Sequence, residues 1–264
     1  MDRVQYLSDL HLERVSPWNW PSVLDVCLKP SAATVILAGD MGSDRDGSLE
    51  AVLQCATERW RHVVYVMGNH EFYDEDKRSV EDIEAAVGAL VARFPSVHWL
   101  HHGHPEWVPG EDSGLPPCVF IGCTLWADVA GKATGINDFK ASSISPDSMS
   151  AMWQRDTGVL ARCLARWREA EGEASAETGR KIVVVTHHMP SFGLISPKYA
   201  MAQGKHAFAS RSEWLMPGVS FWVYGHTHDA GTKVMEPGCV CCVNAVGYMS
   251  EHTGFDPAAA FVLG

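Results

Sequence analysis

Five short polar blocks, spread along the chain, carry side chains that can bind metal ions. The blocks are Asp9-Leu10-His11, Gly39-Asp40, Gly68-Asn69-His70-Glu71, His187-His188 and Gly225-His226-Thr227-His228. Each offers carboxylate, amide or imidazole groups, and none offers a thiolate. A pair of divalent metal ions is the natural occupant of such a donor set, provided that the fold brings the blocks together.

Each block directly follows a short apolar run that is typical of a buried β-strand. The five runs are Val4–Leu7, Thr34–Leu37, Val63–Val66, Ile182–Val185 and Phe221–Tyr224. In α/β folds, ligands bind outside the carboxyl ends of the strands. The sequence therefore predicts that all five blocks converge on one rim of a sheet.

The order of the predicted elements indicates the fold class. Helices are expected over about residues 47–60 and 79–94, the second beginning with a capping box at Ser79 and Asp82 and ending at Pro95. A long helix should begin at Pro146, and strands are expected at 118–122, 232–235, 239–243 and 259–263. Alternating units followed by a strand-rich tail predict an α/β fold in which two mixed β-sheets pack as a sandwich flanked by helices.

Length and composition narrow the possible classes of protein. The 264 residues fit a single domain over 1–264, with a possible substrate-shaping insert at about 101–180. The net charge of −11 and the lack of a basic stripe make nucleic acid an unlikely partner. No apolar stretch approaches the roughly 18 residues of a membrane helix, and no signal peptide is evident. Eight scattered cysteines without a disulfide pattern favour a reducing, cytoplasmic location.

Taken singly, most of the blocks are ordinary. Asp9 and His11 lie two residues apart and would point the same way from an extended segment, but an Asp-x-His triplet is common. An Asp after a strand, as at Asp40, often caps a turn. The informative observation is that five such blocks, each behind a strand, occur in one chain.

The ordered set resembles the signature of the calcineurin-like metallophosphoesterases: D-x-H, G-D, G-N-H-D/E, a single His or G-H, and G-H-x-H. The match runs from residue 7 to residue 228 and implies the sandwich fold described above. By this resemblance one ion would be held by Asp9, His11 and His228, and the second by Asn69, His187 and His226. Asp40 would bridge the two ions, and His70 would lie at the leaving-group side without binding metal.

The fourth block contains two adjacent histidines. Side chains alternate along an extended segment, so only one of them can readily face the metal ions. We expect His187, which directly follows the strand, to be the ligand. His188 would then face the substrate or support a ligand from behind.

The resemblance implies a binuclear metal-dependent hydrolase that cleaves phosphomonoesters or phosphodiesters. A hydroxide shared by the ions would attack phosphorus, since metal charge lowers the pKa of bound water toward about 7. His70 would donate a proton to the leaving group, oriented by Glu71 or another carboxylate. Ligands of this kind favour Mn, Fe, Zn, Ni or Co. Two alternatives are a nuclease acting on DNA or RNA and a non-catalytic interaction scaffold that retains the fold.

The substrate is expected to be small, soluble and phosphorylated, such as a nucleotide. Candidate substrate contacts combine aromatic surface with hydrogen-bonding groups, and they are His188, Trp126, Asp128, Asn137, Asp138, Phe72 and Tyr73. Trp126 could equally be a core residue, with the polar groups capping turns. The segment Asn244–Tyr248 could lie near the rim. The oligomeric state is left open by the sequence.

Overall fold

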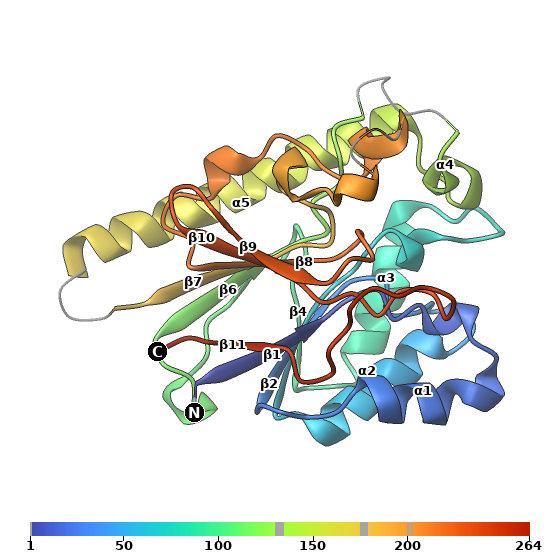
Figure 1. Ribbon diagram of the computed structural model, residues 1–264, viewed down its shortest axis with the longest axis horizontal. Helices are drawn as coiled ribbons and strands as arrows, with labels where there is room; N and C mark the ends of the chain where they lie inside the picture. Colours follow the sequence, from blue (N-terminus) through green and yellow to red (C-terminus); the bar gives the residue numbers. More distant parts are fainter. Residues whose placement is uncertain (1, 130–134, 175–178, 200, 202) are drawn as a thin grey trace.

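Two β-sheets, packed face to face, form the centre of the molecule (Figure 1). The computed structural model describes residues 2–129, 135–174, 179–199, 201 and 203–264. The first sheet contains, in spatial order, β11 (Ala260–Val262), β1 (Arg3–Leu7), β2 (Thr34–Ala38), β3 (His62–Val66) and β4 (Val97–Trp99). Strands β1 to β4 run parallel, and β11 pairs antiparallel with β1, which brings the two ends of the chain close together.

The second sheet has six strands. Their order is β5 (Glu106–Trp107), β6 (Cys118–Gly122), β7 (Lys181–Val185), β8 (Phe221–Tyr224), β10 (Cys239–Val243) and β9 (Gly231–Met235). The four inner strands are parallel, and the edge strands β5 and β9 are antiparallel to their neighbours. Both sheets are therefore mixed, which confirms the predicted fold class.

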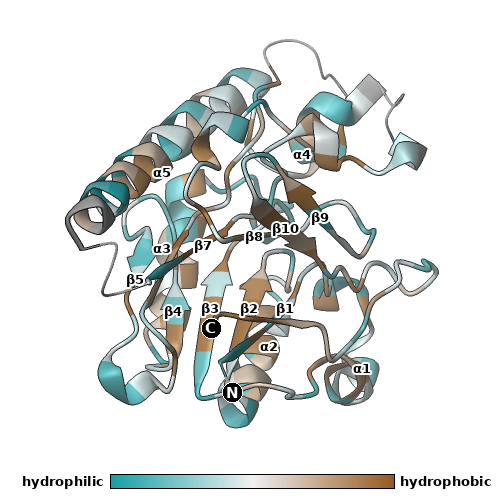
Figure 2. Ribbon diagram, turned by 60° about the vertical axis from the view of Figure 1, so that its left-hand side comes forward, coloured by the Kyte–Doolittle hydropathy of each residue, from teal (hydrophilic) through white to brown (hydrophobic). Residues whose placement is uncertain are grey.

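Strand residues alternate between two cores, as the period of a strand requires. In β2, Ile36 packs between the two sheets, whereas Val35 and Leu37 face the helices on the outer side. The same division holds in β7, where Val183 lies between the sheets and Val184 faces outward. Because both faces are covered, these strands are apolar after their first residues, Thr34 and Lys181, and Figure 2 shows hydrophobic colouring along β2 and β10.

Helices cover the outer face of each sheet (Figure 1). The first sheet is covered by α1 (Trp20–Cys27), α2 (Ser48–Arg59) and α3 (Val80–Val91), and the second by α5 (Pro146–Ala174). A short helix, α4 (Asn137–Ala141), precedes α5. The predicted cap of α3 is present, since the Ser79 side chain accepts a hydrogen bond from the Asp82 backbone N–H. Short 3-10 helices lie at Leu12–Arg14, Pro17–Asn19, His70–Phe72, Glu111–Ser113, Phe192–Leu194, Pro197–Tyr199, Gln203–Ala207 and Glu213–Leu215.

Four helices and strands are absent from the sequence-based expectation: α1, α4, β4 and β5. The strands β4 and β5 are three and two residues long, too short for a periodic pattern. Helices α1 and α4 are eight and five residues long, shorter than the roughly 11–18 residues over which a helical period can be recognised.

The segment 101–180 is largely integral to the second sheet. It supplies β5, β6 and the covering helix α5, and α4 lies beside the site described below. Residues 130–134 and 175–178 of this segment lie outside the described part of the chain. It remains a prediction that this segment shapes the substrate site. It also remains a prediction that residues 1–264 form a single domain.

Among the helices that the structure describes, none combines the length and the apolar character needed to cross a membrane.

Candidate metal centre

All five polar blocks lie at the carboxyl ends of parallel strands. Asp9 and His11 follow β1, Asp40 follows β2, and Asn69 and His70 follow β3 in the first sheet. In the second sheet, His187 follows β7, and His226 and His228 follow β8. The two sheets end at the same place, because hydrogen bonds join the blocks of one sheet to those of the other: His226 N–H donates to Oδ1 of Asp9 at 2.9 Å, and Nδ1 of His187 donates to the carbonyl of Ala38 at 2.8 Å.

The backbone is strained at these positions. Seven non-glycine residues in the described part of the chain have positive φ, and five of them are predicted metal ligands: Asp9, His11, Asp40, His226 and His228. A left-handed conformation costs a residue with a Cβ roughly 1–2 kcal/mol. Such strain persists only where the surrounding structure enforces it, and it concentrates at functional sites.

The first candidate ligand group consists of Asp9, His11 and His228, whose donor atoms all lie within 4.8 Å of one another. Nε2 of His11 is 3.0 Å from Nε2 of His228, and the latter is 3.4 Å from Oδ1 of Asp9. Two imidazole nitrogens facing a carboxylate at these distances suit a cation placed between them.

The second candidate group consists of Asp40, His187 and His226. Nε2 of His187 lies 3.3 Å from Oδ2 of Asp40 and 3.0 Å from Oδ1 of Asn69. The amide oxygen of Asn69 thus joins this group as a neutral donor.

Asp40 faces both groups. Its Oδ2 is 3.3 Å from His187 Nε2 and 3.7 Å from His11 Nε2. Its other oxygen, Oδ1, accepts a hydrogen bond of 2.8 Å from the His70 backbone N–H. Oδ2 is therefore the oxygen of Asp40 that faces both candidate groups.

Hydrogen bonds fix the histidine rings so that Nε2 points inward. Nδ1 of His187 donates to the carbonyl of Ala38 at 2.8 Å, and Nδ1 of His228 pairs with Oε2 of Glu251 at 2.5 Å. Partners of this kind set the tautomer of a metal-binding imidazole and raise its basicity.

Glu13 performs the same task for two rings at once. Its Oε1 lies 3.2 Å from His11 Nδ1 and 3.0 Å from His70 Nδ1. Burial would raise the pKa of Glu13, but hydrogen bonds from these two histidines outweigh burial and lower the pKa to about 2. Glu13 thus stays ionised and orients His70.

Glu71 has a different role from the expected orientation of His70. Its carboxylate accepts hydrogen bonds from the backbone N–H groups of Asp40, Met41 and Gly68, at 3.0, 2.9 and 2.8 Å. It thereby joins the turns that follow β2 and β3. No side chain larger than glycine would fit at Gly68, because a Cβ there would lie 2.1 Å from Oδ1 of Asp40.

The electrostatics of the rim favour bound cations. Burial lowers the pKa of His187, but the carboxylates of Asp40 and Asp9 raise it to about 10. Burial likewise lowers the pKa of His228, and Asp9 and Glu251 raise it to about 9. The buried negative charge thus attracts protons to these rings, and metal ions would replace those protons on binding. The donor set fits a pair of divalent ions.

His188 lies behind the ligand groups. It is buried, its ring centre is 4.4 Å from that of His226 and 5.4 Å from that of Trp126, and neither ring nitrogen has a hydrogen-bond partner among the described residues. Burial and the neighbouring His187 lower its pKa to about 3, so the ring is neutral. Its position is that of a packing neighbour of His226.

A cavity of about 360 Å³ opens directly over the rim. It is lined by Asp40, Asn69, His70, His226 and His228, and on the opposite side by Tyr73, Asn137, Asp138, Phe208 and Tyr248. Three of the predicted substrate contacts, Tyr73, Asn137 and Asp138, therefore face the candidate metal centre.

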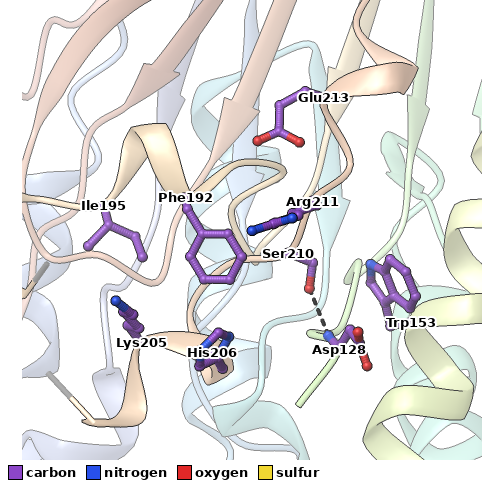
Figure 3. Close-up of a pocket in the computed structure, with 9 residues that line it drawn as sticks. All are labelled: Asp128, Trp153, Phe192, Ile195, Lys205, His206, Ser210, Arg211 and Glu213. Atoms are coloured by element: carbon purple, nitrogen blue, oxygen red, sulfur yellow. Dashed lines mark hydrogen bonds between the residues drawn. The ribbon is translucent and has the colours of Figure 1, made fainter. Parts of the chain in front are cut away.

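Three other predicted substrate contacts lie elsewhere, and the expectation for them needs correction. Phe72 and Trp126 are each 1% exposed and pack edge to face in the core, with ring centres 5.1 Å apart. Asp128 lines a neighbouring cavity of about 740 Å³, where its backbone N–H donates to Ser210 Oγ (Figure 3). Figure 3 shows Phe192 and Arg211 in the same cavity, whose lining includes none of the candidate metal ligands.

Sequence reasoning overlooked Glu13 and Glu251, and it placed Tyr248 only near the rim. Glu13 continues the two-residue spacing of Asp9 and His11, a signal that was available in the sequence. Glu251 lies in the segment after β10, 23 residues beyond His228, so no local sequence pattern links the two residues. Tyr248 has its hydroxyl 3.3 Å from Nε2 of His70.

The model of the calcineurin-like phosphoesterase family matches residues 3–230 of this chain. The chain is 26% identical, over 281 residues, to the uncharacterized protein L509 of Acanthamoeba polyphaga mimivirus, and the match covers 97% of this chain and 95% of that protein.

Two solved structures are similar in fold. The phosphopantetheinyl hydrolase PptH of Mycobacterium tuberculosis has a TM-score of 0.68 at 16% identity, covering 95% of this chain and 93% of that one. A putative 5′-nucleotidase of Staphylococcus aureus has a TM-score of 0.51 at 11% identity, covering 92% of this chain and 48% of that one. The chain belongs to the calcineurin-like phosphoesterase family and is a metal-dependent phosphoesterase.

Proposed function

We propose that this protein is a binuclear metal-dependent hydrolase that cleaves a phosphomonoester or phosphodiester bond of a small soluble substrate. Asp9, His11 and His228 would hold one ion and Asn69, His187 and His226 the other, with Asp40 between them. The proposal rests above all on one observation: Oδ2 of Asp40 faces both ligand groups, at 3.7 Å from His11 and 3.3 Å from His187.

Two bound divalent cations would supply charge for clamping the phosphate and for lowering the pKa of an attacking water. The choice among Mn, Fe, Zn, Ni and Co is left to measurement, since nitrogen and oxygen ligands suit all of them.

The chain itself supplies a proton donor for the leaving group. His70 lines the cavity, and its Nδ1 is held by the ionised carboxylate of Glu13. Nδ1 donates to that carboxylate, which orients the ring so that Nε2 faces the cavity, where it would deliver a proton to the leaving oxygen. The hydroxyl of Tyr248 lies 3.3 Å from Nε2 of His70. The oxygen of a leaving group would lie at a similar distance from Nε2 on this side of the ring.

The size of the cavity supports a small substrate. Its volume of about 360 Å³ is that of a small-molecule pocket, and Tyr73, Asn137 and Asp138 offer it one ring and two polar groups. The two proteins of similar structure are named as a phosphopantetheinyl hydrolase and a putative 5′-nucleotidase, and both names suggest small phosphorylated substrates. A nucleotide is the first substrate to test.

A reducing, cytoplasmic location completes the proposal. All eight cysteines are buried and free, so the fold does not depend on disulfide bonds.

The decisive test of activity uses protein that has been stripped of metal and reloaded with Mn²⁺. It would be assayed on p-nitrophenyl phosphate, bis-p-nitrophenyl phosphate, a panel of mononucleotides and cyclic nucleotides, and single-stranded oligonucleotides. We expect metal-dependent turnover of small esters. Absence of turnover would favour the non-catalytic scaffold, and salt-sensitive cleavage of oligonucleotides alone would favour the nuclease.

The role of His70 has its own test. His70→Ala should keep both metal ions and lose about 10²- to 10⁴-fold in kcat on esters with poor leaving groups, with a smaller loss on p-nitrophenyl esters. The exposed His252 provides a matched control, His252→Ala. Equal losses on both kinds of ester would contradict the role of His70 as a proton donor.

A further inference from the structure

A second opening lies beside the metal centre and differs from it in chemistry. It is a groove of about 690 Å³ between helix α1 and the segment Val246–Ser250. The walls are mainly apolar, including Val15, Val23, Val26 and Met249. Of the residues that line it, only Arg14 is an arginine, lysine, aspartate or glutamate.

The sequence of α1 explains why this groove is apolar. Leu24 and Cys27 are spaced three residues apart and are buried against the first sheet. Val23 and Val26 have the same spacing on an adjacent side of the helix and line the groove, and Val23 also packs partly against the core. A short surface helix normally presents polar residues on the side away from the core, yet Val26 is 59% exposed.

The opposite wall is apolar and exposed as well. The Met249 side chain, on the segment after Gly247, is 81% exposed. Gly247 has a φ of +75°, and a Cβ there would lie 2.5 Å from Thr253 and 2.8 Å from Glu251, so the turn requires glycine. The segment is thus held in a defined position by its backbone.

Tyr248 and His11 connect the groove to the metal centre. Tyr248 lines both the groove and the cavity over the rim, and His11 lines the groove while belonging to the first ligand group. The Tyr248 ring lies 4.6 Å from the His11 ring, and its hydroxyl is 3.3 Å from His70. Tyr248 therefore stands between the two openings, and a molecule with its phosphate group at the metal centre would reach the groove by passing over this ring, which is 38% exposed.

We infer that this groove binds the apolar organic group of the phosphoester substrate, an alkyl or aryl group attached through the ester oxygen. The inference rests on the proposed function, because it assigns the phosphate to the metal centre. It adds a substrate class: amphiphilic phosphoesters whose apolar part contacts α1 and Met249. The affinity for the apolar group of the substrate would then come mainly from the groove, and not from the polar cavity residues Asn137 and Asp138.

Binding of n-alkylphosphonates tests the inference independently of turnover. These compounds carry the phosphate-like group and a chain of chosen length, and they are not hydrolysed. Calorimetry on Mn²⁺-loaded protein would measure the Kd of methyl-, butyl- and octylphosphonate. Each buried methylene group should tighten binding about two- to fourfold, so octylphosphonate should bind about 30-fold or more tighter than methylphosphonate.

Variants locate the binding surface. Val26→Asp and Met249→Asp change exposed positions, so both should fold, and each should reduce the octyl-to-methyl ratio of affinities about tenfold. Val234→Asp, at an exposed valine on β9, should leave that ratio unchanged. Thermal melting of each variant would verify folding.

The possible failures are distinguishable. If esters are turned over but the Kd is independent of chain length, the inference is overturned while the proposed function stands. Absence of both phosphonate binding and ester turnover contradicts the proposed function itself. A dimer seen by light scattering that Val26→Asp dissociates, together with a flat chain-length series, would assign the groove to a second copy of the chain and also overturn the inference.

Discussion

The metal-ligand rim and the walls of the cavity above it are built in opposite ways. Every rim residue directly follows a buried parallel strand, and its backbone is joined to neighbouring blocks by hydrogen bonds. The walls come from distant segments without regular strands, namely the turn before α4, the 3-10 helix Gln203–Ala207 and the segment Val246–Ser250. The difference implies that the reaction centre and the choice of substrate can change independently.

The rim also stores strain that the walls largely lack. Asp9, His11, Asp40, His226 and His228 have positive φ, and buried carboxylates hold the turns around them. On the wall, Gly247 meets the same geometric demand with a residue that tolerates it. Changes to the rim should therefore affect metal binding and catalysis, and changes to the wall should affect substrate affinity or stability.

The largest effect is expected from Asp40→Ala. The variant removes the carboxylate that both ligand groups face, so it should lose one or both metal ions and at least about 10³-fold in kcat/KM. Metal content by mass spectrometry and turnover of p-nitrophenyl phosphate would measure both. Asp76→Ala, at an exposed aspartate, is the matched control. A fully loaded, active Asp40→Ala protein would contradict the bridging assignment.

Glu13→Gln should have the next largest effect. An amide is uncharged and accepts hydrogen bonds less strongly, so it would hold the rings of His11 and His70 less firmly in their orientations. The loss in activity or metal affinity should be about 10- to 100-fold, as for other partners of metal-binding histidines. Glu58→Gln, on an exposed position of α2, should behave like the unaltered protein. Metal titrations and kcat/KM would together detect the change, and unaltered values of both would show that neither ring depends on the charge of Glu13.

Gly247→Ala tests the wall. The added methyl group requires a left-handed alanine and meets Thr253 and Glu251, so the free energy of unfolding should fall by about 1–2 kcal/mol. Gly110→Ala is the matched control, since Gly110 has a φ of −71° and a Cβ added there would meet nothing within 4 Å. Urea denaturation would compare the two. Equal stabilities would show that the turn adapts and that Tyr248 is not held by Gly247.

The smallest effect concerns the pH dependence of stability, which should have a source far from the rim. Burial, with help from His62, lowers the pKa of His98 to about 4, and its ring stacks on Trp107 at 3.7 Å. In the unfolded chain His98 binds a proton near pH 6.5, whereas in the folded protein it does so only near pH 4. The free energy of unfolding therefore decreases as the pH falls from 6.5 toward 4. His98→Phe should weaken the pH dependence of the free energy of unfolding, measured by urea denaturation between about pH 7 and pH 5, by the equivalent of up to about one bound proton. An unchanged slope would exclude His98 as a source.

The rim could be predicted from the sequence because its information is local. A buried strand and the ligands behind it occupy one short continuous segment, as in Val4–His11, and parallel strands bring such segments to one edge. Glu13 was within reach of the same reasoning, since it extends the alternation of Asp9 and His11. The fold class followed from the same runs and from the helices between them.

The walls could not be predicted in this way, because their contacts depend on packing between distant segments. Phe72 follows a polar block and Trp126 follows β6, so both were predicted to contact a substrate, but they pack against each other in the core. Helix α1 went undetected because its eight residues are too few for a helical period to be recognised. The groove that Val23 and Val26 line is completed by a distant segment, Val246–Ser250, which no local pattern reveals. Glu251 reaches His228 only after β10 has passed through the second sheet.

The central claim is that two metal ions share Asp40 at the meeting point of the two sheets. Anomalous diffraction from crystals of the Mn²⁺-loaded protein tests it most directly. We predict two peaks about 3.5–4 Å apart, one beside Asp9, His11 and His228 and the other beside Asn69, His187 and His226, with Asp40 between them. A single peak, or peaks away from Asp40, would contradict the claim.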